Sequence, residues 1–193
     1  MERQNPDCER EWIQAARRGD AQAFEQIVRH YSAQVLNLAL RLCGRIEDAQ
    51  DIHQLAFIKV YASLHGFRAD ANFSTWLFRI VVNVARDLAR AETSHAGAVT
   101  RRAELDGRAC RSQSPAPDLD DSGDWGPRVA HAIARLPQIE REALILRHYL
   151  GMSFTEVAEI VGAPLTTMQS RVLRALQSLR DELLPSTAPH APR

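Results

Sequence analysis

Residues 151–174, with the sequence GMSFTEVAEIVGAPLTTMQSRVLR, decide the fold of the C-terminal part of the chain. Ser153 and Glu156 precede an apolar run and fit a capping box, in which the hydroxyl accepts a hydrogen bond from the third backbone N–H of the helix and the carboxylate reaches back. Gly162 is typical of a residue that ends a helix, and Pro164 of one that begins the next. Two helices joined by so short a turn predict a helix-turn-helix.

The second of these helices is predicted to bury one face and to present hydrogen-bond donors on another. Its apolar stripe is predicted to consist of Leu165, Met168, Val172, Leu176 and Leu179. Its open face carries Thr167, Ser170, Arg171, Arg174 and Ser178. Hydroxyl and guanidinium groups bind phosphates, and Arg can clamp a guanine edge with two parallel bonds. The pattern favours a DNA-reading helix over the alternative, a solvated face on an ordinary helical hairpin.

The residues upstream of this motif indicate a second, separate domain. Pro137 suits the first turn of a helix that Gly151 ends. Residues 112–127, SQSPAPDLDDSGDWGP, are rich in Ser, Pro, Asp and Gly, so they can bury little and are typical of a linker. We therefore predict a helical domain over 1–92, a flexible linker over 93–126, a helix-turn-helix domain over 127–184 and a disordered tail over 185–193.

The first domain is predicted to be helical throughout. Apolar residues recur at helical spacing from Phe24 to Leu42, with Asp20 available as the N-cap and Gly44 as the stop. The segment from Glu47 to Leu64 is apolar on two opposite faces, so this helix must lie centrally or present one face to a partner. Another apolar stripe follows within residues 73–88. No alternating strand pattern competes, so the predicted fold class is all-α.

The last helix of this domain also carries a polar stripe. The stripe consists of Arg79, Asn83, Arg86 and Arg90. An aromatic group precedes it, made of Phe67, Phe73 and Trp76. Aromatic rings beside Arg and Asn suit single-stranded nucleic acid, which needs a stacking surface and amide groups for an exposed base edge. Taken from the residues alone, packing of these aromatics in the core is slightly favoured over base capture, and Trp76 is expected in the core.

The composition indicates an ordinary globular protein. Apolar residues make up 45% and charged residues 25%, and 24 basic residues balance 24 acidic ones. Zero net charge argues against a protein that coats nucleic acid, so DNA binding should be local and assisted by a partner. The three cysteines include no Cys-x-x-Cys pair, and hydrolase, metalloprotease and phosphate-loop motifs are missing. We predict no enzymatic activity, no metal and no cofactor.

Membrane insertion is not expected either. No window approaches the ~18 consecutive apolar residues of a membrane span, and residues 1–6 lack the apolar core of a signal peptide. The expectation is therefore a cytoplasmic protein.

Three segments in order resemble one known family. They are DAQDIHQLAFIKVY at 48–61, FR at 67–68 with FSTWLFRIVVN at 73–83, and a third segment at 136–160 that contains Leu136-Pro137, Arg141-Glu142, Leu146-Arg147 and GMSFTEVAEI. Together they resemble the extracytoplasmic-function (ECF) group of bacterial RNA polymerase sigma factors, over roughly residues 10–184.

This resemblance implies a site for each partner of such a factor. One partner would be core RNA polymerase, through its β′ clamp helices and its β subunit. The first domain would bind the β′ clamp helices through Asp48, Asp51 and Gln54. It would capture melted minus-ten promoter DNA, with a flipped base in a pocket of Phe67, Ile80 and Asn83 and flanking phosphates on Arg79 and Arg86. The second domain would read the duplex minus-35 element with Arg147, Thr167, Gln169, Ser170, Arg171 and Arg174. A cognate anti-sigma factor, often membrane-bound in this group, and a stress-response regulon are implied as well.

Two departures and one alternative accompany the resemblance. Leu55 stands where the family commonly has Glu, which affects the polymerase contact, and Gln169 stands where it has a basic residue, which affects promoter preference. A stand-alone helix-turn-helix regulator is the alternative function. It would explain residues 127–184 but leaves the segment from Asp48 to Asn83 without a role, and it normally needs a dimer to span two half-sites.

Overall fold

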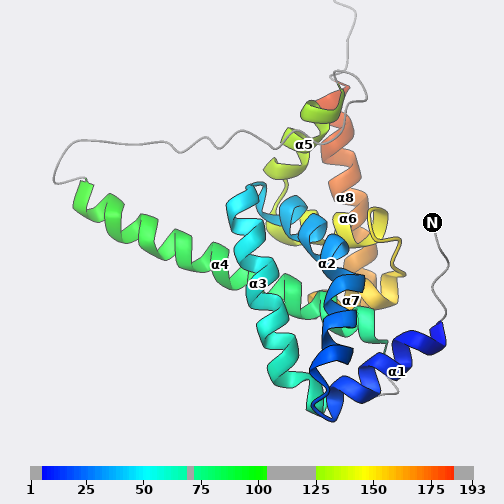
Figure 1. Ribbon diagram of the computed structural model, residues 1–193. Coiled ribbons are helices and arrows are strands. Elements are labelled where there is room, and N and C mark those ends of the chain that lie inside the picture. Colours follow the sequence, from blue (N-terminus) through cyan, green and yellow to red (C-terminus); the bar gives the residue numbers. More distant parts are fainter. Residues whose placement is uncertain (1–5, 69–71, 104–124, 185–193) are drawn as a thin grey trace, which may run out of the picture. The chain divides into compact units, whose positions relative to one another are not determined.

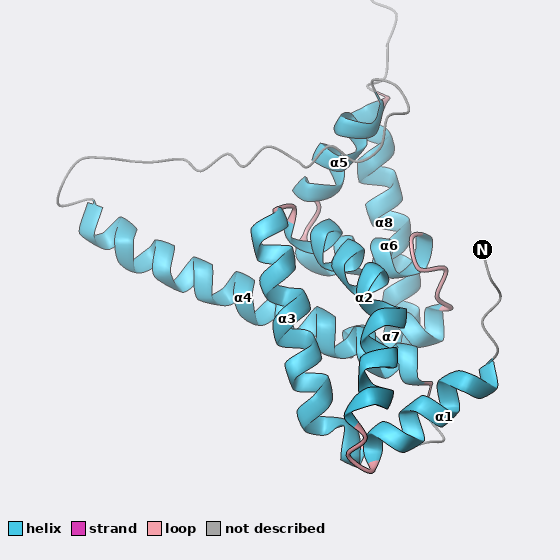
Figure 2. Cartoon of the chain, in the orientation of Figure 1, coloured by secondary structure: helices cyan, strands magenta, loops and turns pink. Residues whose placement is uncertain are grey.

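The computed structural model describes residues 6–68, 72–103 and 125–184. Every regular element in these residues is helical, which confirms the all-α prediction (Figures 1 and 2). The chain divides into two units, Met1–Ser114 and Pro115–Arg193. None of the described helices is both long enough and apolar enough to cross a membrane.

The first unit is built from four α-helices and a short 3-10 turn. Asp20 caps the second helix as predicted, because its Oδ1 accepts hydrogen bonds from the backbone N–H of Gln22 at 2.9 Å and of Ala23 at 3.1 Å. Gly44 ends this helix in the left-handed conformation, with φ of 79°, also as predicted. The elements are α1 (Pro6–Arg17), α2 (Ala21–Cys43), α3 (Ile46–Ser63), η1 (Leu64–Gly66) and α4 (Phe73–Ala103).

Helix α3 lies between α2 and α4 and packs against both. Its inner side buries Ile52 and Val60 completely, and Leu38 of α2 and Leu77 of α4 are fully buried as well. Its outer side leaves three large apolar residues exposed, namely Leu55 at 43%, Ile58 at 56% and Tyr61 at 54%. The helix is therefore packed on both neighbours, as the first of the two predicted alternatives requires, and it also leaves apolar side chains in contact with solvent.

Helix α4 corrects the predicted start of the linker. The prediction placed the boundary at residue 92, but the helix continues through Ala103. The apolar stripe fades there, but residues 93–103 contain no proline, and they contain three Ala and two Arg residues, which favour helix. The rest of the predicted linker up to residue 124 and the predicted tail at 185–193 lie outside the described residues.

The second unit contains the predicted helix-turn-helix. The capping box is present: the Glu156 N–H donates to Ser153 Oγ at 3.2 Å, and the Ser153 N–H donates to the Glu156 carboxylate at 2.8 Å. Gly162 ends the helix with φ of 74°, and Pro164 directly precedes the next one. The elements are α5 (Trp125–Arg135), α6 (Gln138–His148), α7 (Phe154–Val161) and α8 (Leu165–Leu183), with α8 packed on the other three.

The buried face of α8 differs from the predicted stripe. Met168, Val172 and Ala175 are buried, whereas Leu165 and Leu176 are about two-fifths exposed. These two leucines lie on the edge of the stripe, since the helix turns 100° per residue and Ala175 occupies the place that Leu176 was expected to take. A small residue at the contact lets the neighbouring helices approach closely.

Candidate nucleic-acid interfaces

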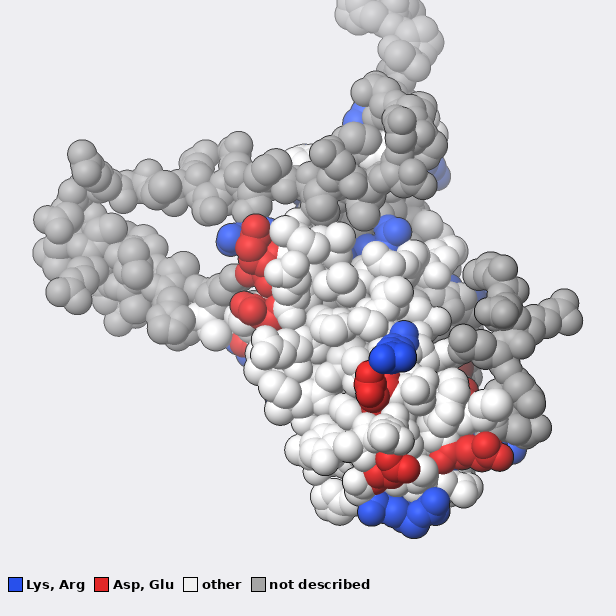
Figure 3. All heavy atoms as spheres, viewed as in Figure 1, with Lys and Arg blue, Asp and Glu red and all other residues white. Residues whose placement is uncertain are grey.

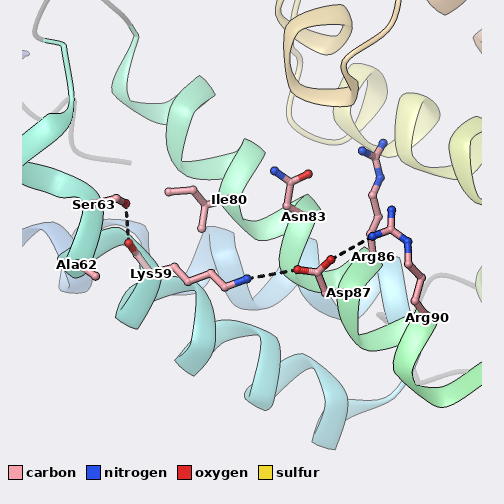
Figure 4. Close-up of a pocket in the computed structure, with 8 residues that line it drawn as sticks. All are labelled: Lys59, Ala62, Ser63, Ile80, Asn83, Arg86, Asp87 and Arg90. Carbon is pink, nitrogen blue, oxygen red and sulfur yellow. Dashed lines mark hydrogen bonds and ion pairs between the residues drawn. The ribbon is translucent and has the colours of Figure 1, made fainter. Parts of the chain in front are cut away.

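A pocket of about 570 Å³ lies between α3 and α4 (Figure 4). It brings together three residues of the predicted minus-ten set, Ile80, Asn83 and Arg86, from one face of α4. They are i, i+3 and i+6 along the helix, so a single helical face presents an apolar wall, an amide and a guanidinium group. The remaining lining residues are Lys59, Ala62 and Ser63 of α3 with Asp87 and Arg90 of α4.

Sequence reasoning missed the charged pair that joins the two walls of this pocket. Asp87 Oδ2 lies 3.3 Å from Lys59 Nζ, and Asp87 Oδ1 lies 3.2 Å from a terminal nitrogen of Arg90. The position of Asp87, four residues after Asn83, was a usable signal, because residues four apart share a helix face. The contact with Lys59 crosses between helices and needed the fold.

Phe67 and Arg79, also predicted for the minus-ten site, do not line this pocket. Phe67 is only 4% exposed, and its ring centroid lies 5.4 Å from that of Phe73 in an edge-to-face contact and 4.9 Å from that of Trp76. The Phe67 N–H also donates to Leu64 O at 3.0 Å. Such a cluster stabilises the ring inside the unit. The structure therefore places Phe67 in the core, as the packing alternative expected, and leaves Arg79 exposed on α4.

The residues predicted to bind polymerase all lie on α3, but they differ in how exposed they are. Asp51 and Gln54 are exposed and lie beside the exposed Leu55. Asp48 is half-buried in the first turn of the helix, where its Oδ2 lies 3.6 Å from the Arg45 guanidinium. An acid at that position also suits the positive end of the helix dipole. The resulting surface mixes polar and apolar groups along one side of α3.

In the second unit, α8 exposes part of its predicted DNA-reading face. Gln169 and Arg174 are exposed, and Thr167, Ser170 and Arg171 are partly exposed. One terminal nitrogen of Arg174 lies 3.9 Å from Glu140 Oε1 of α6. The Ser170 hydroxyl donates to Thr167 O at 2.9 Å, so it is oriented by its own helix.

Arg147 has a structural contact in addition to its predicted role. It donates to Met152 O at 2.9 Å and lies over the Phe154 ring at 5.0 Å from the centroid. These contacts hold the turn between α6 and α7 in place. A guanidinium has five N–H donors, so one bond to a carbonyl still leaves donors for a phosphate.

The charged side chains of the described residues form small groups on the face seen in Figure 3. On the face seen in Figure 3, described Lys and Arg side chains lie singly or beside acidic ones rather than in one basic patch. Over the described part of the chain, no three His, Cys, Asp or Glu side chains gather to hold a metal ion. The face seen in Figure 3 therefore lacks a broad positive patch that would attract nucleic acid by charge alone.

Comparison with known proteins accounts for both units. The Sigma-70 region 2 family matches residues 27–95, and the Sigma-70 region 4 family matches residues 128–179. The RNA polymerase sigma-H factor of Pseudomonas aeruginosa is 34% identical over 178 residues, covering 90% of this chain and 92% of its own. The ECF RNA polymerase sigma-E factor of Escherichia coli K12 is 33% identical, covering 90% of this chain and 93% of its own.

A solved structure supports the same assignment. The sigma factor RpoE of Bartonella quintana, solved with the anti-sigma factor NepR, superposes with a TM-score of 0.67 at 26% identity and covers 84% of this chain and 98% of its own. A stand-alone regulator is not favoured, because region 2 matches the first unit that such a regulator leaves unexplained. The relatives are transcription initiation factors and not catalysts. The chain belongs to the ECF group of bacterial RNA polymerase sigma factors, and it is an alternative sigma factor that initiates transcription.

Proposed function

We propose that the pocket between α3 and α4 takes an unpaired base of the minus-ten promoter element. The observation that carries this is the meeting of Ile80, Asn83 and Arg86 in one pocket of about 570 Å³. An apolar wall can pack on a base, an amide offers both a donor and an acceptor to its edge, and a guanidinium can hold the adjoining phosphate. The volume lies within the roughly 300–1,000 Å³ of ligand pockets.

Phe67 takes a different part in this proposal. Its ring is enclosed by Phe73 and Trp76, so stacking on a base would require it to leave that cluster. We assign to it the support of the chain that leads into α4, while Ile80 forms the apolar wall of the pocket.

The test of the base pocket is Asn83→Ala. Holoenzyme carrying this variant should bind a promoter that the wild-type holoenzyme has selected from genomic DNA, but it should open that promoter poorly, as read by permanganate reactivity of unpaired thymines. Flipping a base costs a few kcal/mol, which the pocket must return. Asn37→Ala is a matched control, since Asn37 is exposed on α2 outside the pocket. Normal opening by Asn83→Ala would refute this role.

The N-terminal half of α8 is proposed to read the minus-35 element. Its exposed or partly exposed polar groups are those of Thr167, Gln169, Ser170, Arg171 and Arg174. Arg147, in the last turn of α6, is proposed to assist them. Arg174 must exchange Glu140 for DNA, and the 3.9 Å separation of that pair makes the exchange easy.

The exposed side of α3 is proposed to bind the β′ clamp helices. Asp51 and Gln54 supply polar contacts there, while Asp48 acts from a half-buried position. Leu55 and Ile58 leave apolar surface in water, a feature typical of surfaces that meet a partner. Leu55 would then supply an apolar contact where the family commonly has a carboxylate.

Regulation follows the same family logic. The B. quintana relative was solved with an anti-sigma factor, which supports a cognate anti-sigma factor for this chain and a stress-response regulon under its control. The site of action is the cytoplasm, where polymerase and promoters are found. Copurification from the native cell would identify the anti-sigma factor, and recovery of polymerase alone in both growing and stressed cells would argue against one.

A further inference from the structure

The minus-ten pocket contains one carboxylate among its lining residues, and binding of a base and its phosphate does not call for it. Asp87 places its two oxygens on two different cations, Lys59 of α3 at 3.3 Å and Arg90 of α4 at 3.2 Å. Figure 4 shows Lys59 reaching across from α3 to Asp87, and it shows Asn83 and Arg86 on α4 among the residues that line the pocket. Asp87 therefore pairs with two of the three cations that line the pocket.

We propose that Asp87 is a specificity-determining residue of this pocket. It engages Lys59 and Arg90 in intramolecular ion pairs, so that these cations bind phosphates less readily and the amide of Asn83 contributes a larger share of the discrimination among DNA sequences. This inference rests on the proposed function of the pocket as a base-binding site.

The physical reason is that phosphate contacts carry no sequence information. Each cation that neutralises a phosphate adds the same affinity for every sequence and makes binding more salt-dependent. A carboxylate already 3.3 Å from Lys59 Nζ competes with any incoming phosphate for that cation. Removing the carboxylate should therefore strengthen binding to every single-stranded sequence. It should also reduce the difference in affinity between the sequence that binds most tightly and the one that binds least tightly.

The ion pairs can be broken without unfolding the unit. The side chains of Lys59, Asp87 and Arg90 are 53%, 57% and 75% exposed, and pairs this open to water contribute little to stability. Asp87→Asn keeps the shape and removes the charge. Thermal unfolding followed by circular dichroism verifies that the variant is folded.

The experiment measures binding of the full chain to fluorescent oligo-dA, oligo-dC and oligo-dT of about 12 nucleotides. Anisotropy titrations run from about 50 to about 200 mM salt. Asp87→Asn should bind all three more tightly, with a slope of log K against log salt that is steeper by about 0.7 for Lys59 and up to about 1.4 if Arg90 is also released. For this variant, the ratio of the binding constant of the tightest-bound oligonucleotide to that of the weakest-bound one should fall.

Three further variants separate this role from simple support of the fold. Asp87→Glu should restore the wild-type slope and ratio, and adding Lys59→Gln to Asp87→Asn should remove the Lys59 share of the extra slope. Glu25→Gln is the matched control, because it makes the same charge change and releases Arg29 from an exposed pair at 2.7 Å outside the pocket. It should leave slope and ratio unchanged.

The outcomes also distinguish failure of the role of Asp87 from failure of the proposed base-binding function. An unchanged slope in Asp87→Asn, weaker binding at the same slope, or no measurable binding by either wild type or variant overturns the role of Asp87. If Asn83→Ala keeps the wild-type ratio among the three oligonucleotides, the base-binding function itself is wrong. Loss of that ratio in Asn83→Ala together with an unchanged slope in Asp87→Asn refutes only the role of Asp87.

Discussion

Arg174→Ala should weaken recognition of one base pair in the minus-35 element. A bidentate contact from Arg to guanine is worth about 1–3 kcal/mol, so the dissociation constant should rise about 5- to 150-fold on the preferred sequence. The fold should be unaffected, since the Arg174 side chain is 63% exposed and its contact with Glu140 is 3.9 Å long. The Glu140 side chain is only 15% exposed, but a separation of 3.9 Å is at the limit of an ion pair, so loss of this contact should change the free energy of unfolding little.

The same ion pair predicts an opposite effect for its partner. Glu140→Gln removes the charge that competes with DNA for Arg174, so binding should tighten by up to about fivefold, the equivalent of about 1 kcal/mol. The double variant should behave as Arg174→Ala alone, because Glu140 acts only through Arg174.

The assay is anisotropy of holoenzyme on duplex promoter fragments that carry every single-base change in the minus-35 element. Discrimination should relax at one position in Arg174→Ala and be kept at the others. Equal weakening on all fragments would show a phosphate contact instead. If the single variant Arg174→Ala and the double variant that also carries Arg171→Ala both keep the wild-type affinity, the placement of α8 on DNA is refuted.

Other predictions concern polymerase binding, pH and proteolysis. Asp51→Ala with Gln54→Ala should cost about 2 kcal/mol or more of affinity for core polymerase if these are hot-spot contacts, and full retention in a pull-down would place the surface elsewhere. Burial lowers the pKa of His53 below 6.5, so the unfolded chain binds more protons at this residue and the free energy of unfolding should fall as pH drops below about 6.5. Urea unfolding of His53→Asn should lose this pH dependence. An unaltered pH profile in the variant would exclude His53 as its source. Trypsin should cut after Arg108 or Arg111 before Arg101 or Arg102, because the latter two lie in α4, and early cleavage at Arg101 would contradict the helical end of α4.

Local chemistry explains why so much of the fold was predictable. Asp20, Gly44, Ser153 with Glu156, and Gly162 all cap helices as expected, since a cap depends only on its own few residues. The end of α4 was missed because the pattern followed burial, and helix can continue on propensity alone. Leu165 and Leu176 were wrongly predicted to be buried, because spacing alone does not show which edge of an apolar stripe packs against a neighbouring helix.

The site was predictable along one helix but not across two. Asn83 and Arg86 were found because they share the polar stripe of α4, and Ile80 was found through the family resemblance. The meeting of Lys59 with Asp87 depends on how α3 packs on α4, which no spacing reveals. The burial of Phe67 likewise depends on rings brought from other parts of the unit.

The contact between Tyr31 and Glu9 has a consequence for anyone who dissects this chain into fragments. Burial and the nearby Glu9 carboxylate raise the pKa of Tyr31, so its hydroxyl remains protonated and donates to Glu9 Oε1 at 2.5 Å, tying α1 to α2. The Tyr31 ring also lies 5.5 Å from that of Phe73 at the start of α4. A fragment cut at residue 27, where the region 2 family match begins, would discard α1 and uncover this buried tyrosine. Fragments meant to report on promoter melting should keep α1, because its loss would loosen the base of the helix that carries Asn83.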